Sequence, residues 1–249
     1  IRHCWEQVPY YRERWQPLGI TGPGDIASPA DYARLPMLQK PEIRANFDKL
    51  IALDQRDGLL YKTTGGSTGE PLRFGYTRDS YQRRLAVMWR GYGWSGAQLG
   101  QRTLYLWSIP LSRERGAQPP VNPGSVSLWD SMLGGQKRKD RLYHAAFNRL
   151  MLNSFEMTEA RMSTYADAID RFRPLTIVAY VSSLVRLAEW LLATGRRIHS
   201  PCRILGAAES LHEHQRKILE EAFGCPAYNT YGCREFMLIA AECEHRGGL

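Results

Sequence analysis

The feature that most constrains the fold is a regular alternation of helical and strand patterns between Thr158 and Thr230. Three segments carry apolar residues every three or four positions, as one face of a helix does. Short apolar runs at 175–181, 202–206 and 227–230 follow these segments in turn and are expected to be strands. Helices and strands that alternate at these lengths build a parallel sheet covered by helices. The sequence therefore predicts the α/β class, with parallel or mixed sheets.

The ends of the expected helices carry capping signals. Thr158 can cap the first of the three, and Gly195 closes the second. Ser210 and Glu213 have the spacing of a capping box for the third helix, because the serine can bond the N3 amide while the glutamate bonds back. Asp79 is the expected cap of an earlier helix with a continuous apolar face.

A loop rich in glycine and hydroxyl groups separates two further expected strands, 59–62 and 72–77. Glycines let backbone amides approach an anion closely, and hydroxyls add donors, so residues 65–69 suit a phosphate group. A Walker loop or a dinucleotide fingerprint needs a helix directly after the loop, and Glu70, Pro71 and an alternating strand follow here instead. From composition alone, a plain hairpin loop explains this segment equally well.

The remaining segments and the overall charge are less specific. Prolines spread over 17–41 exclude a long helix there, and residues 108–140 are expected to form a long surface excursion. The 33 Lys and Arg against 25 Asp and Glu give a formal charge of +8, but the basic residues are dispersed and no nucleic-acid-binding module is visible. No apolar run is long enough to span a membrane. Five cysteines without a secretion signal favour reduced thiols and a cytoplasmic location.

Three motifs, in order along the chain, resemble the signatures of the adenylate-forming (AMP-binding) superfamily. Thr63–Pro71 (TTGGSTGEP) is similar to its phosphate loop between two strands, with Glu70 where the family has a lysine. Gly206–Glu209 (GAAE) is similar to the segment that lines its adenine and acyl pocket. Asn229–Glu235 (NTYGCRE) is similar to its Asn-x-Tyr-Gly-x-Thr-Glu motif, with Arg234 at the threonine position.

Within the superfamily, the chain resembles the phenylacetate–CoA ligase group, which includes CapK-like proteins. The shared segments are 8–12, 35–40, 154–155, 231–236 and 241–245. The resemblance implies that residues 1–249 are part of the N-terminal AMP-binding domain, truncated and without the C-terminal lid domain, whose signatures are absent. We therefore expect poor turnover from this chain alone.

The resemblance implies a nucleotide site built from the three motifs. Tyr231 is expected to stack on adenine, Asn229 to hydrogen-bond its amino edge, and the backbone of residues 206–208 to frame the ring. The residues implied to bind ATP or AMP are Thr63, Gly65, Gly66, Ser67, Thr68, Gly69, Gly206, Ala207, Ala208, Glu209, Asn229, Thr230, Tyr231 and Gly232.

The implied catalytic residues are Glu235, Arg234 and Thr68. Glu235 is expected to help hold Mg²⁺, which prefers carboxylate and phosphate oxygens, and Arg234 to contact the α-phosphate. Taken singly, Tyr231–Gly232 can also be interpreted as a structural turn and Glu235 as a surface helix residue. Cys243 and His245 are candidate ligands of a structural zinc, although two ligands are not four and unliganded side chains are favoured.

Three functions agree with these patterns. The first is an ATP-dependent ligase that activates a small-molecule carboxylic acid and transfers the acyl group to coenzyme A. Tyr180, Ala207 and Ala208 are the candidate lining of the acid pocket. The second is a CapK-like adenylyltransferase of surface-polysaccharide assembly. The third is a non-catalytic nucleotide-binding domain, which the departures at Glu70 and Arg234 keep open. The expected partners are the acid and, in a homodimer, a second copy of the chain, with no nucleic acid.

Overall fold

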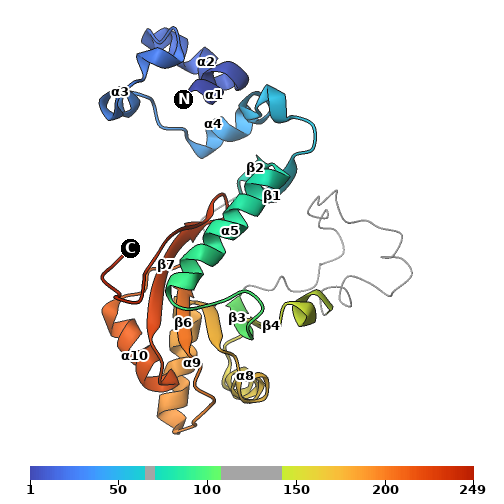
Figure 1. The fold of residues 1–249 in the computed structure, drawn as a ribbon, viewed down its shortest axis with the longest axis vertical. Helices are drawn as coiled ribbons and strands as arrows, with labels where there is room; N and C mark the ends of the chain where they lie inside the picture. The colour runs from blue at the N-terminus through green and yellow to red at the C-terminus, as the bar shows by residue number, and fades with distance from the viewer. Residues whose placement is uncertain (65–70, 108–141) are drawn as a thin grey trace, which may run out of the picture. The chain divides into compact units, whose positions relative to one another are not determined.

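The computed structural model describes residues 1–64, 71–107 and 142–249, and these form two compact units (Figure 1). One unit extends to Tyr81 and the other begins at Gln82. The expected surface excursion at 108–140 lies outside the described residues. Every helix in the described ranges is too short or too polar to cross a membrane.

The first unit begins with short helices, as its prolines predict. Pro9 and Pro29 each occupy the first turn of a helix, where the missing N–H is not needed. Its helical elements are α1 (Arg2–Gln7), α2 (Pro9–Trp15), η1 (Gln16–Leu18), η2 (Pro23–Asp25), α3 (Pro29–Ala33), α4 (Lys40–Ala45), η3 (Phe47–Leu50) and η4 (Leu53–Gln55). Trp15, Ile20 and Ile26 form a small buried core among them.

The same unit contains the strand pair predicted around the glycine-rich loop. β1 (Leu60–Thr63) and β2 (Arg73–Tyr76) are antiparallel, with Leu60 opposite Tyr76 and Thr63 opposite Arg73. Thr64 continues the pairing, because its N–H donates to the Leu72 carbonyl at 2.9 Å and its Oγ1 accepts the Leu72 N–H at 2.9 Å. The loop therefore starts and ends at adjacent points of one hairpin.

The second unit confirms the predicted α/β class. Its described residues form a six-stranded sheet in the order β4-β3-β5-β6-β7-β8. The first five strands are parallel, and β8 is antiparallel to β7. The strands are β3 (Thr103–Trp107), β4 (Arg149–Asn153), β5 (Thr176–Tyr180), β6 (Arg203–Ala207), β7 (Ala227–Cys233) and β8 (Met237–Ala241).

Helices cover both faces of this sheet (Figure 1). α8 (Glu159–Phe172), α9 (Val181–Thr194) and α10 (Glu213–Phe223) pack on one face, where side chains such as Leu104 and Ile177 point. α5 (Arg78–Trp94) packs on the other face, toward which Val178 and Leu205 point because side chains alternate along a strand. A Cβ at Gly91 would lie 2.2 Å from Leu238 Cδ2, so a glycine lets α5 approach β8 closely.

Two of the expected helix caps are wrong. α10 begins at Glu213, and the reciprocal bond runs from the His212 N–H to Gln215 Oε1 at 3.0 Å, so Ser210 and Glu213 do not form a capping box. The cause is a shift of the helix start, because Leu211 is buried in the core and the helix turns only after it. At α5 the cap is Thr77, whose Oγ1 accepts the Ser80 N–H at 3.1 Å.

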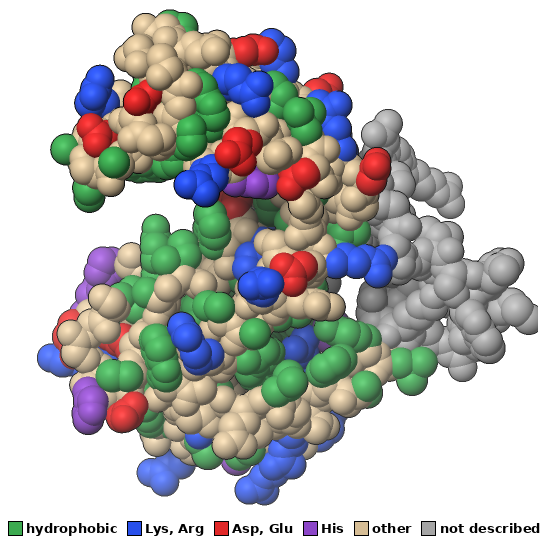
Figure 2. Space-filling view, turned by 45° about the horizontal axis from the view of Figure 1, so that its top comes forward, with side chains coloured by type: hydrophobic (Ala, Val, Ile, Leu, Met, Phe, Trp, Pro, Cys, Tyr) green, Lys and Arg blue, Asp and Glu red, His purple; other side chains and the backbone are tan. Residues whose placement is uncertain are grey.

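Asp79 lies within the first turn of α5, rather than at its cap. Two other predicted helix ends are confirmed. Thr158 does cap α8 by accepting the Arg161 N–H, and Gly195 ends α9 with a φ of 65°. On the face drawn in Figure 2, basic side chains are interspersed with acidic and uncharged ones, in agreement with the dispersed charge of the sequence.

Candidate functional site

The carboxyl ends of β6 and β7 meet at a cavity of ≈ 140 Å³. Residues that follow β6 line it on one side, namely Ala208, Glu209 and Ser210. The other lining residues are Asn229, Thr230, Tyr231 and Gly232 of β7, and Leu249. The two strands are tied here by the Thr230 Oγ1 hydroxyl, which donates to the Gly206 carbonyl at 2.7 Å. The structure thus brings the second and third predicted motifs to one place, where open α/β sheets bind ligands.

Asn229 supplies the most specific polar group of this cavity. Asn229 pairs with Gly206 in the parallel ladder of β6 and β7. Its side-chain Oδ1 is buried and accepts no hydrogen bond from any described residue. A buried acceptor without a partner costs free energy, so a ligand that brings an N–H donor to this oxygen is favoured. The exocyclic amino group of adenine is such a donor.

Tyr231 and Gly232 lie within a strand. β7 continues through Cys233 with an irregularity at Tyr231/Gly232, and β8 pairs with it, so the interpretation of Tyr231–Gly232 as a structural turn is wrong. A Cβ at Gly232 would lie 1.9 Å from the Met237 carbonyl oxygen, so a glycine is needed for the two strands to approach. The Tyr231 side chain is 58% exposed, which leaves its ring available for stacking.

Arg234 and Glu235 lie in the turn of residues 234–236 that joins β7 to β8. The interpretation of Glu235 as a surface helix residue is therefore wrong. Arg84 of α5 donates a hydrogen bond to the Glu235 carbonyl oxygen, so the turn is attached to the helix on that face of the sheet. Glu235 is half-buried and Arg234 is exposed.

Glu209 lines the cavity but also has a structural partner. Its carboxylate accepts the Ser182 N–H at 2.6 Å and the Ser182 hydroxyl at 2.9 Å, at the start of α9. A carboxylate in this position satisfies a free amide of the first helical turn and interacts favourably with the helix dipole. The side chain of Glu209 is therefore held by Ser182 at the start of α9.

The predicted phosphate loop is only partly described. Gly65, Gly66, Ser67, Thr68, Gly69 and Glu70 lie outside the described residues. Thr63 ends β1, next to Lys62, whose ammonium group lies 5.1 Å from the ring centre of Tyr76 and 4.8 Å from that of Tyr81. Cation–π contacts of this kind stabilise the base of the hairpin.

The metal expectations differ in how well the described residues fit them. No three His, Cys, Asp or Glu side chains in the described part of the chain are placed to hold a metal together. His245 is 84% exposed and Cys243 is half-buried, so the zinc hypothesis gains no support. Mg²⁺ needs fewer protein ligands, because it keeps water and phosphate oxygens, and the single Glu235 carboxylate fits that requirement.

Two features at the carboxyl edge of the sheet were not found from sequence. Trp107, the last residue of β3, stacks on Tyr180, the last residue of β5, with ring centres 4.5 Å apart and planes 25° apart. Ser154 follows β4, and its Oγ is buried without a partner among the described residues. An aromatic residue at the end of a buried strand, as Trp107 is, was the available signal.

The chain is similar in sequence to curated proteins. No protein-family model matches the chain. It is 24% identical to "Protein CapK" of Staphylococcus aureus over 207 residues, which are 83% of the chain and 42% of that protein. It is 25% identical to a phenylacetate-coenzyme A ligase of Pseudomonas putida over 248 residues, which are 98% of the chain and 51% of that protein. The chain thus spans about half the length of the curated relatives it matches.

Solved structures share the fold. A crystal structure of 2-hydroxyisobutyryl-CoA ligase in complex with 2-HIB-AMP and CoA matches this chain with a TM-score of 0.68 and 18% sequence identity. The match covers 97% of this chain and 49% of the ligase chain. An open conformation of the same ligase, also with 2-HIB-AMP and CoA, matches 98% of the chain and 54% of its own with a TM-score of 0.65 and 16% identity. The arrangement of helices and strands described above is that of these ligases.

Proposed function

We propose, from the premise that this chain belongs to the adenylate-forming superfamily and to its phenylacetate–CoA ligase and CapK branch, that it binds ATP and activates a carboxylic acid as an acyl-AMP. The acyl group then passes to coenzyme A. The observation that carries the proposal is the cavity between β6 and β7, where the unpartnered Asn229 Oδ1 lies beside the exposed ring of Tyr231. A flat ring that carries an amino group can stack on Tyr231 and donate a hydrogen bond to Asn229 Oδ1.

In the proposed reaction, the protein aligns the reactants and neutralises charge, and it needs no nucleophile of its own. Tyr231 stacks on adenine, Asn229 accepts its amino group, and Thr63 with residues 65–69 binds the phosphates. The acid's carboxylate attacks the α-phosphorus, and pyrophosphate leaves. Arg234 offsets the charge of the α-phosphate, with Thr68 beside the phosphates, and Mg²⁺, when bound at Glu235, neutralises negative charge on the phosphate oxygens.

Residues 1–249 are proposed to be part of the N-terminal AMP-binding domain of such an enzyme. The acid is proposed to lie at the carboxyl edge of β3, β5 and β6. The stacked Trp107 and Tyr180 support this position, since they end two of those strands, and Ala207 ends the third. Apolar and aromatic walls with few polar groups are typical of small-molecule sites.

Transfer to an acceptor other than coenzyme A is the second candidate. It is favoured by the match to CapK over 83% of the chain and by the sequence 241–245. A non-catalytic nucleotide-binding domain is the third, and it is favoured by Glu70 and Arg234, which replace the residues usual at those positions of the motifs.

The first experiment measures ATP binding to this chain by calorimetry, in the wild type and in Asn229→Ala. We expect the variant to bind ATP about 3- to 10-fold more weakly, because it loses one hydrogen bond to the base. His214→Ala is the control, since this residue of α10 is exposed and does not line the cavity. Equal ATP affinity in the wild type and Asn229→Ala would contradict the adenine site.

The second experiment measures ATP–pyrophosphate exchange across a panel of carboxylic acids, with and without coenzyme A. Exchange that depends on the acid supports activation, and an acyl-CoA product that requires coenzyme A separates the ligase from the CapK-like reaction. ATP binding without exchange for any acid would contradict acid activation and favour the non-catalytic domain.

A further inference from the structure

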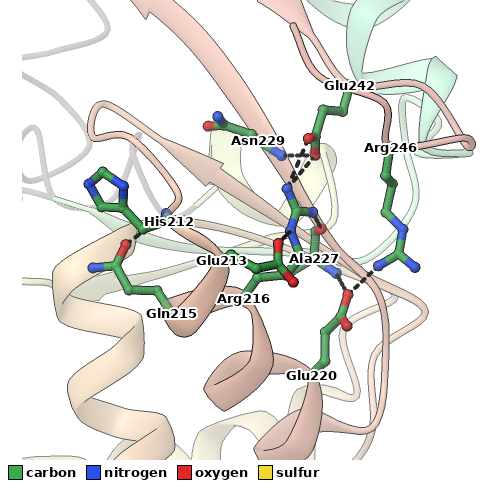
Figure 3. A network of polar contacts seen from close by, with 9 residues as sticks. All are labelled: His212, Glu213, Gln215, Arg216, Glu220, Ala227, Asn229, Glu242 and Arg246. Carbon is green, nitrogen blue, oxygen red and sulfur yellow. Dashed lines mark hydrogen bonds and ion pairs between the residues drawn. The ribbon is translucent and has the colours of Figure 1, made fainter.

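An almost completely buried ion pair lies beside the backbone of Asn229 (Figure 3). It joins Arg216 of α10 to Glu242, the residue after β8, and their side chains are 11% and 4% exposed. One guanidinium nitrogen, Nη2, donates to both carboxylate oxygens, at 2.8 and 3.0 Å. Because loss of water offsets the attraction of two buried charges, such a pair adds little to stability. The geometry that it fixes is the better explanation for it.

Glu242 contacts both backbone hydrogen-bonding groups of Asn229, one through its carboxylate and the other through its own N–H. Glu242 Oε2 accepts the Asn229 N–H at 2.7 Å, and the Glu242 N–H donates to the Asn229 carbonyl at 3.0 Å. Two residues earlier in the same strand, the Ala227 carbonyl accepts from Arg216 Nη1. The Asn229 backbone therefore cannot rotate without breaking contacts to a buried charge.

We propose that Arg216 and Glu242 are positioning residues for recognition of the nucleotide base, and that they hold Asn229 so that its Oδ1 meets the amino group of the base. Neither side chain lines the cavity between β6 and β7, so both act through Asn229. This inference rests on the proposed function, because it takes that cavity as the adenine site.

The test compares two affinities in each protein variant, for ATP and for purine riboside 5′-triphosphate, which lacks only the 6-amino group. The ratio of the two dissociation constants does not depend on how much of the sample is folded, so a purely structural role would leave it unchanged. In the wild type we expect ATP to bind about 3- to 10-fold more tightly, the range of one hydrogen bond to a buried acceptor.

Two variants address the ion pair. Arg216→Met with Glu242→Met removes both charges together and so leaves no unpaired buried charge. We expect its ratio to fall to within about 2-fold of one, because no group then accepts the Asn229 N–H. Glu242→Gln keeps the shape but has one acceptor oxygen for two donors, so its NH₂ must face either Arg216 or the Asn229 N–H. We expect its ratio to fall as well, and this variant decides if the double variant does not fold.

Arg246→Met is the matched control. Arg246 is ion-paired with Glu220, which lies in α10 as Arg216 does. Glu220 accepts the Ala227 N–H at 3.0 Å. The control therefore alters the same polar network without changing a contact of Asn229 (Figure 3). Its ratio should equal that of the wild type. If both Glu242 variants keep the wild-type ratio of dissociation constants, the positioning role is wrong. It is also wrong if Arg246→Met lowers that ratio as much as the Glu242 variants do. No preference for ATP in the wild type would instead contradict the adenine site itself.

Discussion

Tyr231 combines an exposed aromatic ring with a backbone that is held in a strand. Its ring is 58% exposed at the edge of the cavity, while the residues on either side of it belong to paired strands. An aromatic ring held on a strand and open to solvent loses little conformational entropy when a flat partner stacks on it. The site therefore offers the base a fixed surface.

We expect Tyr231→Ala to weaken ATP binding by about 5- to 150-fold, since a base stacked on an aromatic ring gains roughly 1–3 kcal/mol. Tyr231→Phe keeps the stacking surface and should bind ATP nearly as the wild type does. Calorimetric titration with ATP measures both. Equal losses in the two variants would show that the hydroxyl, rather than the ring, contacts the nucleotide.

At Glu209 we expect an effect on stability. Glu209→Ala removes the acceptor of the Ser182 N–H at the start of α9 and should lower the free energy of unfolding by about 0.5–2 kcal/mol, the usual value of a helix cap. Ser182→Ala removes only the hydroxyl bond and should cost less. Urea unfolding followed by circular dichroism measures both, and a larger loss in Ser182→Ala would contradict the capping role.

At the scale of elements, the hairpin of β7 and β8 depends on close approach at one position. Gly232→Ala would place a Cβ 1.9 Å from the Met237 carbonyl oxygen, and backbone cannot move aside as a flexible side chain can. We expect a loss of about 1–3 kcal/mol in the free energy of unfolding. Gly247→Ala is the control, because its Cβ meets open space. Equal stability of the two variants would show that the hairpin can shift to accept a side chain.

The elements also show what local patterns can predict. The amphipathic segments of α8 and α9 and the buried strands β5 and β6 were predicted from sequence. A helix buried on one face carries apolar residues every three or four positions, and a strand buried on both faces is a short apolar run. β4 and β8 were not found. They are the edge strands of the described sheet. β4 depends on pairing with β3, which lies far away in the chain, and β8 depends on folding back against β7.

The site shows a similar division. The motif residues Gly206 and Asn229 are 23 positions apart, and the parallel strand pattern correctly placed both at one edge of the sheet. The roles of Arg216 and Glu242 could not be predicted, since a charged residue in the first turn of a helix and another after an edge strand carry no local sign of pairing. Only the tertiary structure brings them together.

At the scale of the whole molecule, two buried acidic groups predict a loss of stability at alkaline pH. Burial raises the pKa of the Cys225 thiol from 9.0 to about 12, and it also raises the pKa of Tyr92. Above pH 9 the unfolded chain releases the Cys225 proton while the folded chain retains it, so the free energy of unfolding falls as pH rises.

We expect the decline due to Cys225 to approach at most about 1.4 kcal/mol per pH unit between pH 9 and pH 11, and Tyr92 to add to it only above pH 10. Cys225→Ala should show a shallower decline, whereas Cys233→Ala, which removes an exposed thiol, should follow the wild type. Urea unfolding at a series of pH values measures the slope. Identical slopes in the wild type and Cys225→Ala would contradict the raised pKa.

The strand order β4-β3-β5-β6-β7-β8 has a consequence for how the sheet can assemble as the chain is synthesised. β3 emerges first, β4 and β5 join its two sides, and each later strand pairs with the one made just before it. Among the strands of the described residues, none has to be inserted between two earlier ones. The sheet can therefore grow outward during synthesis on the ribosome. When β7, which contains Asn229, leaves the ribosome, its partner β6 has already been synthesised.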